Sequence, residues 1–142
     1  MAAIATFNWP LRVYYEDTDA GGVVYHSQYL NFMERARTEW LRYLGFHQTT
    51  LRDELNVLFV VHSMQVNFKK PAKFDDALTI SSQLLALGRG SFTCRQTIVR
   101  VTTQTGTQDI LIEADVKIAC VNALNFKPMG IPAPIKQSME SQ

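Results

Sequence analysis

Asp19, Gly21 and Gly22 stand just before a stretch of sequence with the periodicity of a long helix. The first backbone N–H groups of a helix have no intrahelical partner, and the helix dipole adds partial positive charge at that end. Such a helix start attracts anions and can stabilise an oxyanion. The spacing therefore predicts a site where a carboxylate, able to act as a base or a nucleophile, faces an electropositive helix start.

The elements that would position this site follow from the hydrophobic pattern. Alternating apolar and polar residues predict a first strand from about Phe7 to Glu16. The helix should run for roughly 18 residues after the glycines and stop at Gly45, which can take a positive φ. A short second helix is predicted from about Thr49 to Leu55. The apolar stripe of the long helix consists of Tyr29, Met33, Ala36, Trp40 and Leu44.

Four further strands are predicted from alternating residues in 60–69, 78–86, 92–98 and 110–120. A strand, a long helix and four strands joined by short loops indicate an α+β fold. Its five-stranded antiparallel sheet would curve around the single long helix. One helix cannot cover both faces of such a sheet. Self-association is therefore predicted from the apolar residues on the opposite face, Leu85, Leu87, Val99 and Val101.

Length and composition limit the classes of protein. The 142 residues are predicted to form one domain, 1–142, with an irregular proline-rich tail from about 125 to 142. The net charge of +1 argues against a nucleic-acid partner. No secretory signal is evident, and the longest purely apolar run, Val57–Val61, is too short for an integral membrane segment. Cys94 and Cys120 form no CxxC pair and are expected to be buried thiols of a cytoplasmic protein, with a disulfide as the alternative.

The stretch YYEDTDAGGVVYHSQYLNFMERAR, residues 14–37, resembles hot-dog acyl-CoA thioesterases of the 4-hydroxybenzoyl-CoA thioesterase family. Within that family it is most similar to the Tol–Pal-associated branch of Gram-negative bacteria. The stretches VNFKKPAKFDDALTI and EADVKIACV also resemble the family, so the resemblance spans about Phe7 to Val121. It implies a curved antiparallel sheet around a central helix, in dimers or tetramers.

The resemblance implies roles for individual residues. Asp19 matches the catalytic carboxylate of the family, and the N–H of His26 matches the helix-start amide that polarises the thioester carbonyl. Gly21 and Gly22 match the turn between them. Glu34 stands where the hydroxybenzoyl branch has an aspartate that binds the ring hydroxyl, and this longer acid argues against a hydroxybenzoyl substrate.

Thioester hydrolysis needs a positioned carboxylate and an oxyanion site, because the carbonyl is already electrophilic and a thiolate leaves well. Asp19 would either attack the carbonyl or activate water, while helix-start N–H groups hold the oxyanion. In the structural alternative, Asp19 is a turn or N-cap acid, and the ring of His26 only caps or packs. The resemblance favours catalysis for Asp19 and, for His26, the amide over the imidazole.

Two more residues could belong to the site. Tyr15 is expected on the face of Val13, either in the core or with its hydroxyl near Asp19. His62 shares its predicted face with Val60 and is expected to be buried and hydrogen-bonded, with active-site lining as the alternative. The histidines lack metal-binding spacing, so no metal is predicted.

Coenzyme A carries phosphates, which Lys and Arg bind well. Lys69, Lys70 and Lys73 flank Pro71, and Arg89 sits in a glycine-rich turn, so these four cations are candidate phosphate ligands. The alternative is that they are solvated surface charges. Coenzyme A would be part of the substrate, and no cofactor is predicted.

Together these residues predict a cytoplasmic homo-dimer or homo-tetramer that hydrolyses acyl-CoA thioesters, with acyl carrier protein as an alternative carrier of the acyl group. A hot-dog hydratase is a second hypothesis, although that chemistry uses a catalytic histidine and an acid in a different arrangement. A third is a non-catalytic acyl-thioester-binding adaptor of the cell-envelope or lipid-synthesis machinery.

Overall fold

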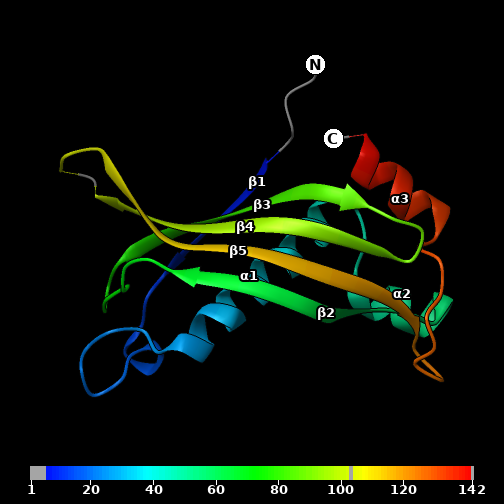
Figure 1. The fold of residues 1–142 in the computed structure, drawn as a ribbon, viewed down its shortest axis with the longest axis horizontal. Helices are drawn as coiled ribbons and strands as arrows, with labels where there is room; N and C mark the ends of the chain where they lie inside the picture. Colours follow the sequence, from blue (N-terminus) through cyan, green and yellow to red (C-terminus); the bar gives the residue numbers. More distant parts are fainter. Residues whose placement is uncertain (1–5, 103, 142) are drawn as a thin grey trace.

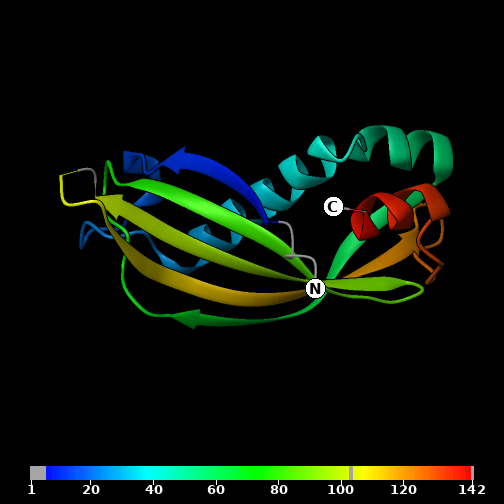
Figure 2. The same cartoon turned by 90° about the horizontal axis from the view of Figure 1, so that it is seen from above.

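Five antiparallel strands form one sheet in the computed structural model, which describes residues 6–102 and 104–141. Across the sheet the order is β1-β3-β4-β5-β2, so β1 and β2 are its edges. Figures 1 and 2 show the sheet curving around the long helix α1 (His26–Tyr43), which confirms the predicted α+β arrangement. The strands are β1 Thr6–Arg12, β2 Val57–Phe68, β3 Ala77–Leu87, β4 Ser91–Thr102 and β5 Thr107–Asn122.

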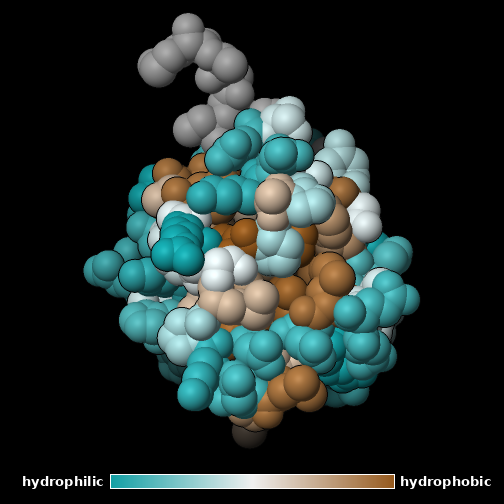
Figure 3. Space-filling model, turned by 90° about the vertical axis from the view of Figure 1, so that its right-hand side faces the viewer, coloured by the Kyte–Doolittle hydropathy of each residue, from teal (hydrophilic) through white to brown (hydrophobic). Residues whose placement is uncertain are grey.

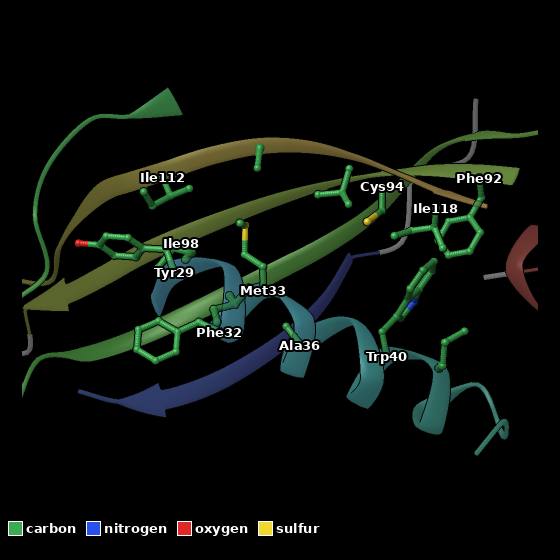
Figure 4. Close-up of a cluster of buried hydrophobic side chains, with 14 of the residues drawn as sticks. Tyr29, Phe32, Met33, Ala36, Trp40, Phe92, Cys94, Ile98, Ile112 and Ile118 are labelled. Atoms are coloured by element: carbon green, nitrogen blue, oxygen red, sulfur yellow. The ribbon is translucent and has the colours of Figure 1, made fainter. Parts of the chain in front are cut away.

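One face of α1 is buried against the sheet. The helix has 18 residues, as predicted, and its apolar stripe steps by three or four so that one side is continuously hydrophobic. Of the predicted stripe, Leu44 alone is only partly buried. Figure 4 labels the buried cluster between α1 and the strands: Tyr29, Phe32, Met33, Ala36, Trp40, Phe92, Cys94, Ile98, Ile112 and Ile118.

The end of α1 lies where the sequence predicts it. Gly45 has a φ of +99°, and its N–H donates to the carbonyl of Arg42 at 3.0 Å. The N–H of Phe46 donates to the carbonyl of Leu41 at 2.9 Å, which completes a Schellman C-cap. The predicted second helix is also confirmed as α2 (Gln48–Leu55), which packs beside β2.

The first strand is shorter than predicted, since β1 ends at Arg12 rather than Glu16. Tyr15–Asp17 form a turn of 3₁₀ helix, η1. The cause is Asp17, whose carboxylate is 4% exposed and accepts the N–H of Tyr14 at 2.8 Å. This local hydrogen bond turns the chain away from the sheet before it enters the loop that carries Asp19.

The tail is not irregular throughout, as predicted, because it ends in a helix, α3 (Ala133–Glu140). Pro132 is its N-cap and Pro134 lies in its first turn, where a missing N–H breaks no helical hydrogen bond. Ile135 and Met139 are buried and hold α3 on the fold. Figure 3 views the end of the molecule that holds α2 and α3, where hydrophobic side chains gather in the middle and hydrophilic ones surround them.

Candidate active site

The loop between η1 and α1 is a tight turn that backbone hydrogen bonds of Asp19 close. The N–H of Asp19 donates to the carbonyl of Val23 at 2.9 Å, and the N–H of Gly22 donates to the carbonyl of Asp19 at 3.0 Å. Gly22 has a φ of +82°, which side chains disfavour. The N–H of Val24 then donates to the carbonyl of Ala72 at 2.9 Å, so the end of the turn is fixed to the chain before β3.

One carboxylate oxygen of Asp19 is held and the other is available. Oδ1 accepts the N–H of Gly21 at 2.8 Å. A Cβ at Gly21 would lie 3.2 Å from Oδ1, so only glycine allows this approach without a shift. Oδ2 has no hydrogen-bond partner within residues 6–102 and 104–141. A reactant could therefore approach this second oxygen.

Asp19 and the start of α1 line the same cleft, whose volume is about 240 Å³. The structure thus brings together four residues singled out in the sequence, namely Asp19, His26, Lys69 and Lys70. The complete lining is Asp19, Val23, Val24, Tyr25, His26, Tyr29, Phe68, Lys69, Lys70 and Pro71.

No side chain in the described part of the chain caps the start of α1. Tyr25 is the N-cap residue in an extended conformation, so the first N–H groups of the helix, beginning with that of His26, have no side-chain acceptor. The exposed ring of His26 packs edge-on against Phe68, with the ring centroids 4.8 Å apart. The backbone of His26 thus offers a hydrogen-bond donor to an oxyanion, while its ring forms part of the wall.

Two buried polar residues that the sequence did not single out hold the site together. Gln28, in the first turn of α1, donates its side-chain N–H to Oδ1 of Asp17 at 2.6 Å, and both residues are buried. The same amide accepts a hydrogen bond from Asn31 at 2.9 Å. This contact ties η1 to the helix start, so the turn carrying Asp19 is fixed opposite α1. Only the tertiary structure brings the two residues together; the acid-rich EDTD stretch was the available signal for Asp17.

Tyr29 supports the cleft from within the core. Its hydroxyl accepts the N–H of Ala72 at 2.9 Å, and burial raises the pKa of the phenol. The neutral hydroxyl thereby anchors the Pro71–Ala72 segment to α1. The periodicity identified Tyr29 as a stripe residue but gave no signal for this hydrogen bond.

Tyr15 and His62 do not lie where the sequence predicts. Tyr15 leaves the face of Val13 because β1 has already ended; it is 75% exposed and stacks on Phe74, outside the cleft. His62 is exposed because the register of β2 against β5 shifts between Val61 and Ser63. This irregularity interrupts the alternation that predicted a buried histidine, and His62 lines neither the cleft nor the groove beyond it.

Arg89 and Glu34 also lie apart from the cleft. Arg89 is in the turn between β3 and β4, at the opposite end of the molecule from the start of α1 (Figure 1). Its carbonyl accepts the N–H of Ile131, so it anchors the C-terminal segment. Glu34 is exposed two turns along α1 from His26.

Glu34 borders a larger groove of about 490 Å³, which lies further along the same two elements, α1 and β2. Its lining is mostly apolar. The residues are Leu30, Asn31, Glu34, Arg37, Thr38, Trp40, Leu41, Gln48, Phe59, Val60, Val61, Met64, Phe92 and Ile118.

The lysines beside the cleft are exposed and partly paired. Lys69 lies 3.4 Å from Glu113, and Lys70 lies 3.1 Å from Asp109. Hydrogen bonds from Lys70 and Arg100 lower the pKa of the Asp109 carboxyl. Exposed ion pairs of this kind contribute little to stability, so both lysines can exchange their partners for phosphate at small cost.

Comparison with known proteins identifies the family of this chain. The model of the thioesterase superfamily matches residues 21–107. The chain belongs to this superfamily. An Escherichia coli relative named acyl-CoA thioester hydrolase YbgC is 46% identical over 129 residues, which cover 91% of this chain and 92% of that protein.

Two solved structures resemble this superfamily member. A probable thioesterase from Bartonella henselae is 38% identical, covers 90% of this chain and 100% of its own, and has a TM-score of 0.82. The 4-hydroxybenzoyl CoA thioesterase from Pseudomonas sp. strain CBS-3 has a TM-score of 0.86, with coverage of 96% and 99%. Its identity is 21%, so the likeness shows the fold alone. The predicted hot-dog fold is confirmed.

Proposed function

We propose that this protein hydrolyses acyl-CoA thioesters in the cleft lined by Asp19 and the start of α1. The observation that carries the proposal is that an acid with one available oxygen shares a cleft with an uncapped helix start. The name of the E. coli relative supports the substrate class. The hydratase and adaptor hypotheses have no comparable observation in their favour.

In this mechanism the thioester carbonyl lies between Asp19 and the N–H of His26. The available Oδ2 either attacks the carbonyl carbon, giving a mixed anhydride, or removes a proton from an attacking water. The N–H groups at the helix start stabilise the negative charge on the carbonyl oxygen as the tetrahedral intermediate forms. That intermediate collapses and expels the thiolate of coenzyme A.

The first test is hydrolysis of a panel of acyl-CoAs, followed by thiol release. We expect Asp19→Asn to lower kcat by about 100-fold or more, because the amide can neither attack nor accept a proton. Glu16→Gln is the matched control, since it removes an exposed acid three positions away and should keep activity near wild type. Equal thiol release by wild type and Asp19→Asn would contradict the assignment.

Single-turnover hydrolysis in oxygen-18 water separates the two routes. Attack by Asp19, followed by hydrolysis of the anhydride at the carboxyl carbon of Asp19, places label in its carboxylate, whereas water activation places label only in the released acid. His26→Ala should retain much of the activity on either route, because the substitution keeps the backbone N–H. Near-total loss in His26→Ala would instead assign the chemistry to the ring.

Lys69 and Lys70 are proposed to bind the phosphates of coenzyme A, which is part of the substrate, and we propose no separate cofactor. Reversing either charge should raise KM with little change in kcat. Arg89 lies at the opposite end of the molecule from this cleft (Figure 1). Its proposed contact with a coenzyme A phosphate therefore requires the cleft of a second copy of the protein.

We also propose that the protein works in the cytoplasm as a homo-dimer or homo-tetramer. The support is a set of exposed apolar side chains on the strands: Val61 of the edge strand β2 is 46% exposed, Leu85 of β3 is 40% exposed and Ile110 of β5 is 42% exposed. None of the helices within the described residues has the length and apolar character of a membrane span. Light scattering would measure the oligomer. Hydrolysis of acyl carrier protein thioesters would test acyl carrier protein as the alternative carrier of the acyl group. Co-purification with Tol–Pal components would test association with that system.

A further inference from the structure

Arg37 carries a charge into the interior without an acidic partner. The residue is 9% exposed and lies on the buried side of α1. Its Nη1 donates to Oε1 of Gln96 at 2.9 Å, and this is its one hydrogen bond within residues 6–102 and 104–141. Gln96 is itself buried and occupied, because its amide N–H groups donate to Met33 and Ser82, each at 3.0 Å.

No residue within 6–102 and 104–141 forms an ion pair with Arg37. Glu34 is the acid that acts on it from the next turn of α1, but the two form no ion pair in the described part of the chain. Cys94 is also close, yet burial raises the pKa of its thiol to about 11, so at neutral pH it brings no negative charge. Burial lowers the pKa of Arg37, which is the direction expected for a desolvated cation. Such a cation is costly to bury unless it is paired.

Arg37 is one of the residues that line the groove between α1 and β2. Every fully buried side-chain nitrogen or oxygen among the described residues has a hydrogen-bond partner. Nε and Nη2 of Arg37 have none, so they are not fully buried and reach the groove. These two atoms form one edge of the guanidinium, the edge that binds a carboxylate through two parallel hydrogen bonds.

The groove is placed to receive an acyl chain from the cleft. The cleft contacts α1 at Tyr29 and β2 at Phe68, and the groove contacts α1 from Leu30 and β2 at Met64. Arg37 is eleven residues after His26, or about 16 Å along the helix axis, and its side chain points back toward the helix start. A medium-length acyl chain could span the interval between the thioester carbonyl and the guanidinium.

We propose that Arg37 is a specificity-determining residue that selects acyl groups carrying an oxygen acceptor at their far end, with a carboxylate favoured over a hydroxyl. This inference rests on the proposed thioesterase function. The apolar part of the lining, which includes Leu30, Met64 and Phe92, contacts the methylene chain. A methyl-ended chain of the same length would leave the guanidinium edge desolvated and without an acceptor.

The test compares kcat/KM for decanoyl-CoA with its ω-hydroxy and ω-carboxy counterparts, and repeats the comparison with hexanoyl, octanoyl and dodecanoyl chains. At one or more lengths the wild type should favour the ω-carboxy substrate over the methyl-ended one by about tenfold, mainly through KM. Arg37→Met keeps an unbranched apolar stem but removes the donors, and should abolish the preference. Arg37→Lys keeps the charge but not the two parallel donors of the guanidinium edge, so it should retain only part of the preference.

The matched control is Arg35→Met, which removes an exposed guanidinium from α1 outside this groove and should leave the preference unchanged. Melting temperatures distinguish a folding defect from a loss of substrate preference. If Arg37→Met does not fold, the comparison is made with Arg37→Lys. Hydrolysis of every chain with no preference in the wild type would overturn the inference while leaving the proposed function intact. So would an oligomer structure in which an acid of a second copy pairs with Arg37. No hydrolysis of any acyl-CoA would instead reject the proposed function.

Discussion

At the scale of single residues, Asp19 is aimed by backbone contacts. Its Oδ1 is fixed by the N–H of Gly21, and its own backbone closes the turn with Val23. Fixing one oxygen presents the other to the cleft at low entropic cost, which is how a positioned carboxylate gains reactivity. Gly21 and Gly22 thus matter for different reasons, the first for close approach and the second for its positive φ.

Gly21→Ala tests this positioning. A Cβ 3.2 Å from Oδ1 should displace the carboxylate by a few tenths of an ångström, so we expect kcat to fall by about tenfold, since small misplacements of catalytic groups are costly. The melting temperature should change little. In Gly130→Ala, the control, the nearest atoms to the new Cβ lie at 3.8 Å, and kcat should stay near wild type. An unchanged kcat in Gly21→Ala would show that the Gly21 contact does not aim the acid.

At the scale of elements, the site exists because two segments are fixed to α1. The buried hydrogen bond between Asp17 and Gln28 holds η1 against the first helical turn. The hydroxyl of Tyr29 accepts the N–H of Ala72 and so holds the Pro71–Ala72 segment beside α1. Breaking the first contact, as in Gln28→Ala, leaves a buried carboxylate short of a donor and frees the loop that carries Asp19.

The contribution of α3 can be measured separately from catalysis. Ile135 of α3 is 1% exposed and belongs to the hydrophobic core, so Ile135→Ala should lower the free energy of unfolding by about 2–5 kcal/mol. Because α3 lies at the end of the molecule away from the start of α1 (Figure 1), kcat of the folded variant should remain near wild type. Denaturant unfolding and steady-state kinetics on the same sample check both halves. A large fall in kcat without loss of stability would contradict this division.

At the scale of the whole molecule, the burial of Cys94 makes stability depend on alkaline pH. Burial raises the pKa of its thiol from 9.0 to about 11, so folding favours the neutral form. The resulting stability is fully present below pH 9 and is lost as the pH rises through about 11, because the unfolded chain ionises first. The loss amounts to about 3 kcal/mol.

Melting temperatures measured between pH 7 and pH 11.5 would show this dependence. We expect a flat region up to about pH 9 and a decline above it. Cys94→Ala should flatten the decline in part, because Cys120, with a pKa also raised to about 11, still contributes. An identical slope in the variant and the wild type would exclude Cys94 as a source.

By itself the sequence determined the order of the elements from β1 to β5, the length of α1, its stop at Gly45, and the position of Asp19 and Gly22 just before that helix. Each of these depends on local rules: periodicity, glycine conformation and spacing along the chain. Only the tertiary structure decided the positions of Tyr15, His62 and Arg37. Tyr15 is exposed because β1 ends early, at a turn held by the local hydrogen bond from Tyr14 to Asp17 and by the contact of Asp17 with Gln28. A register shift between β2 and β5 exposes His62, and Gln96 of the distant strand β4 holds Arg37, so contacts between remote segments set these two positions. The helix in the proline-rich tail required the same information, since docking of Ile135 and Met139 stabilises it.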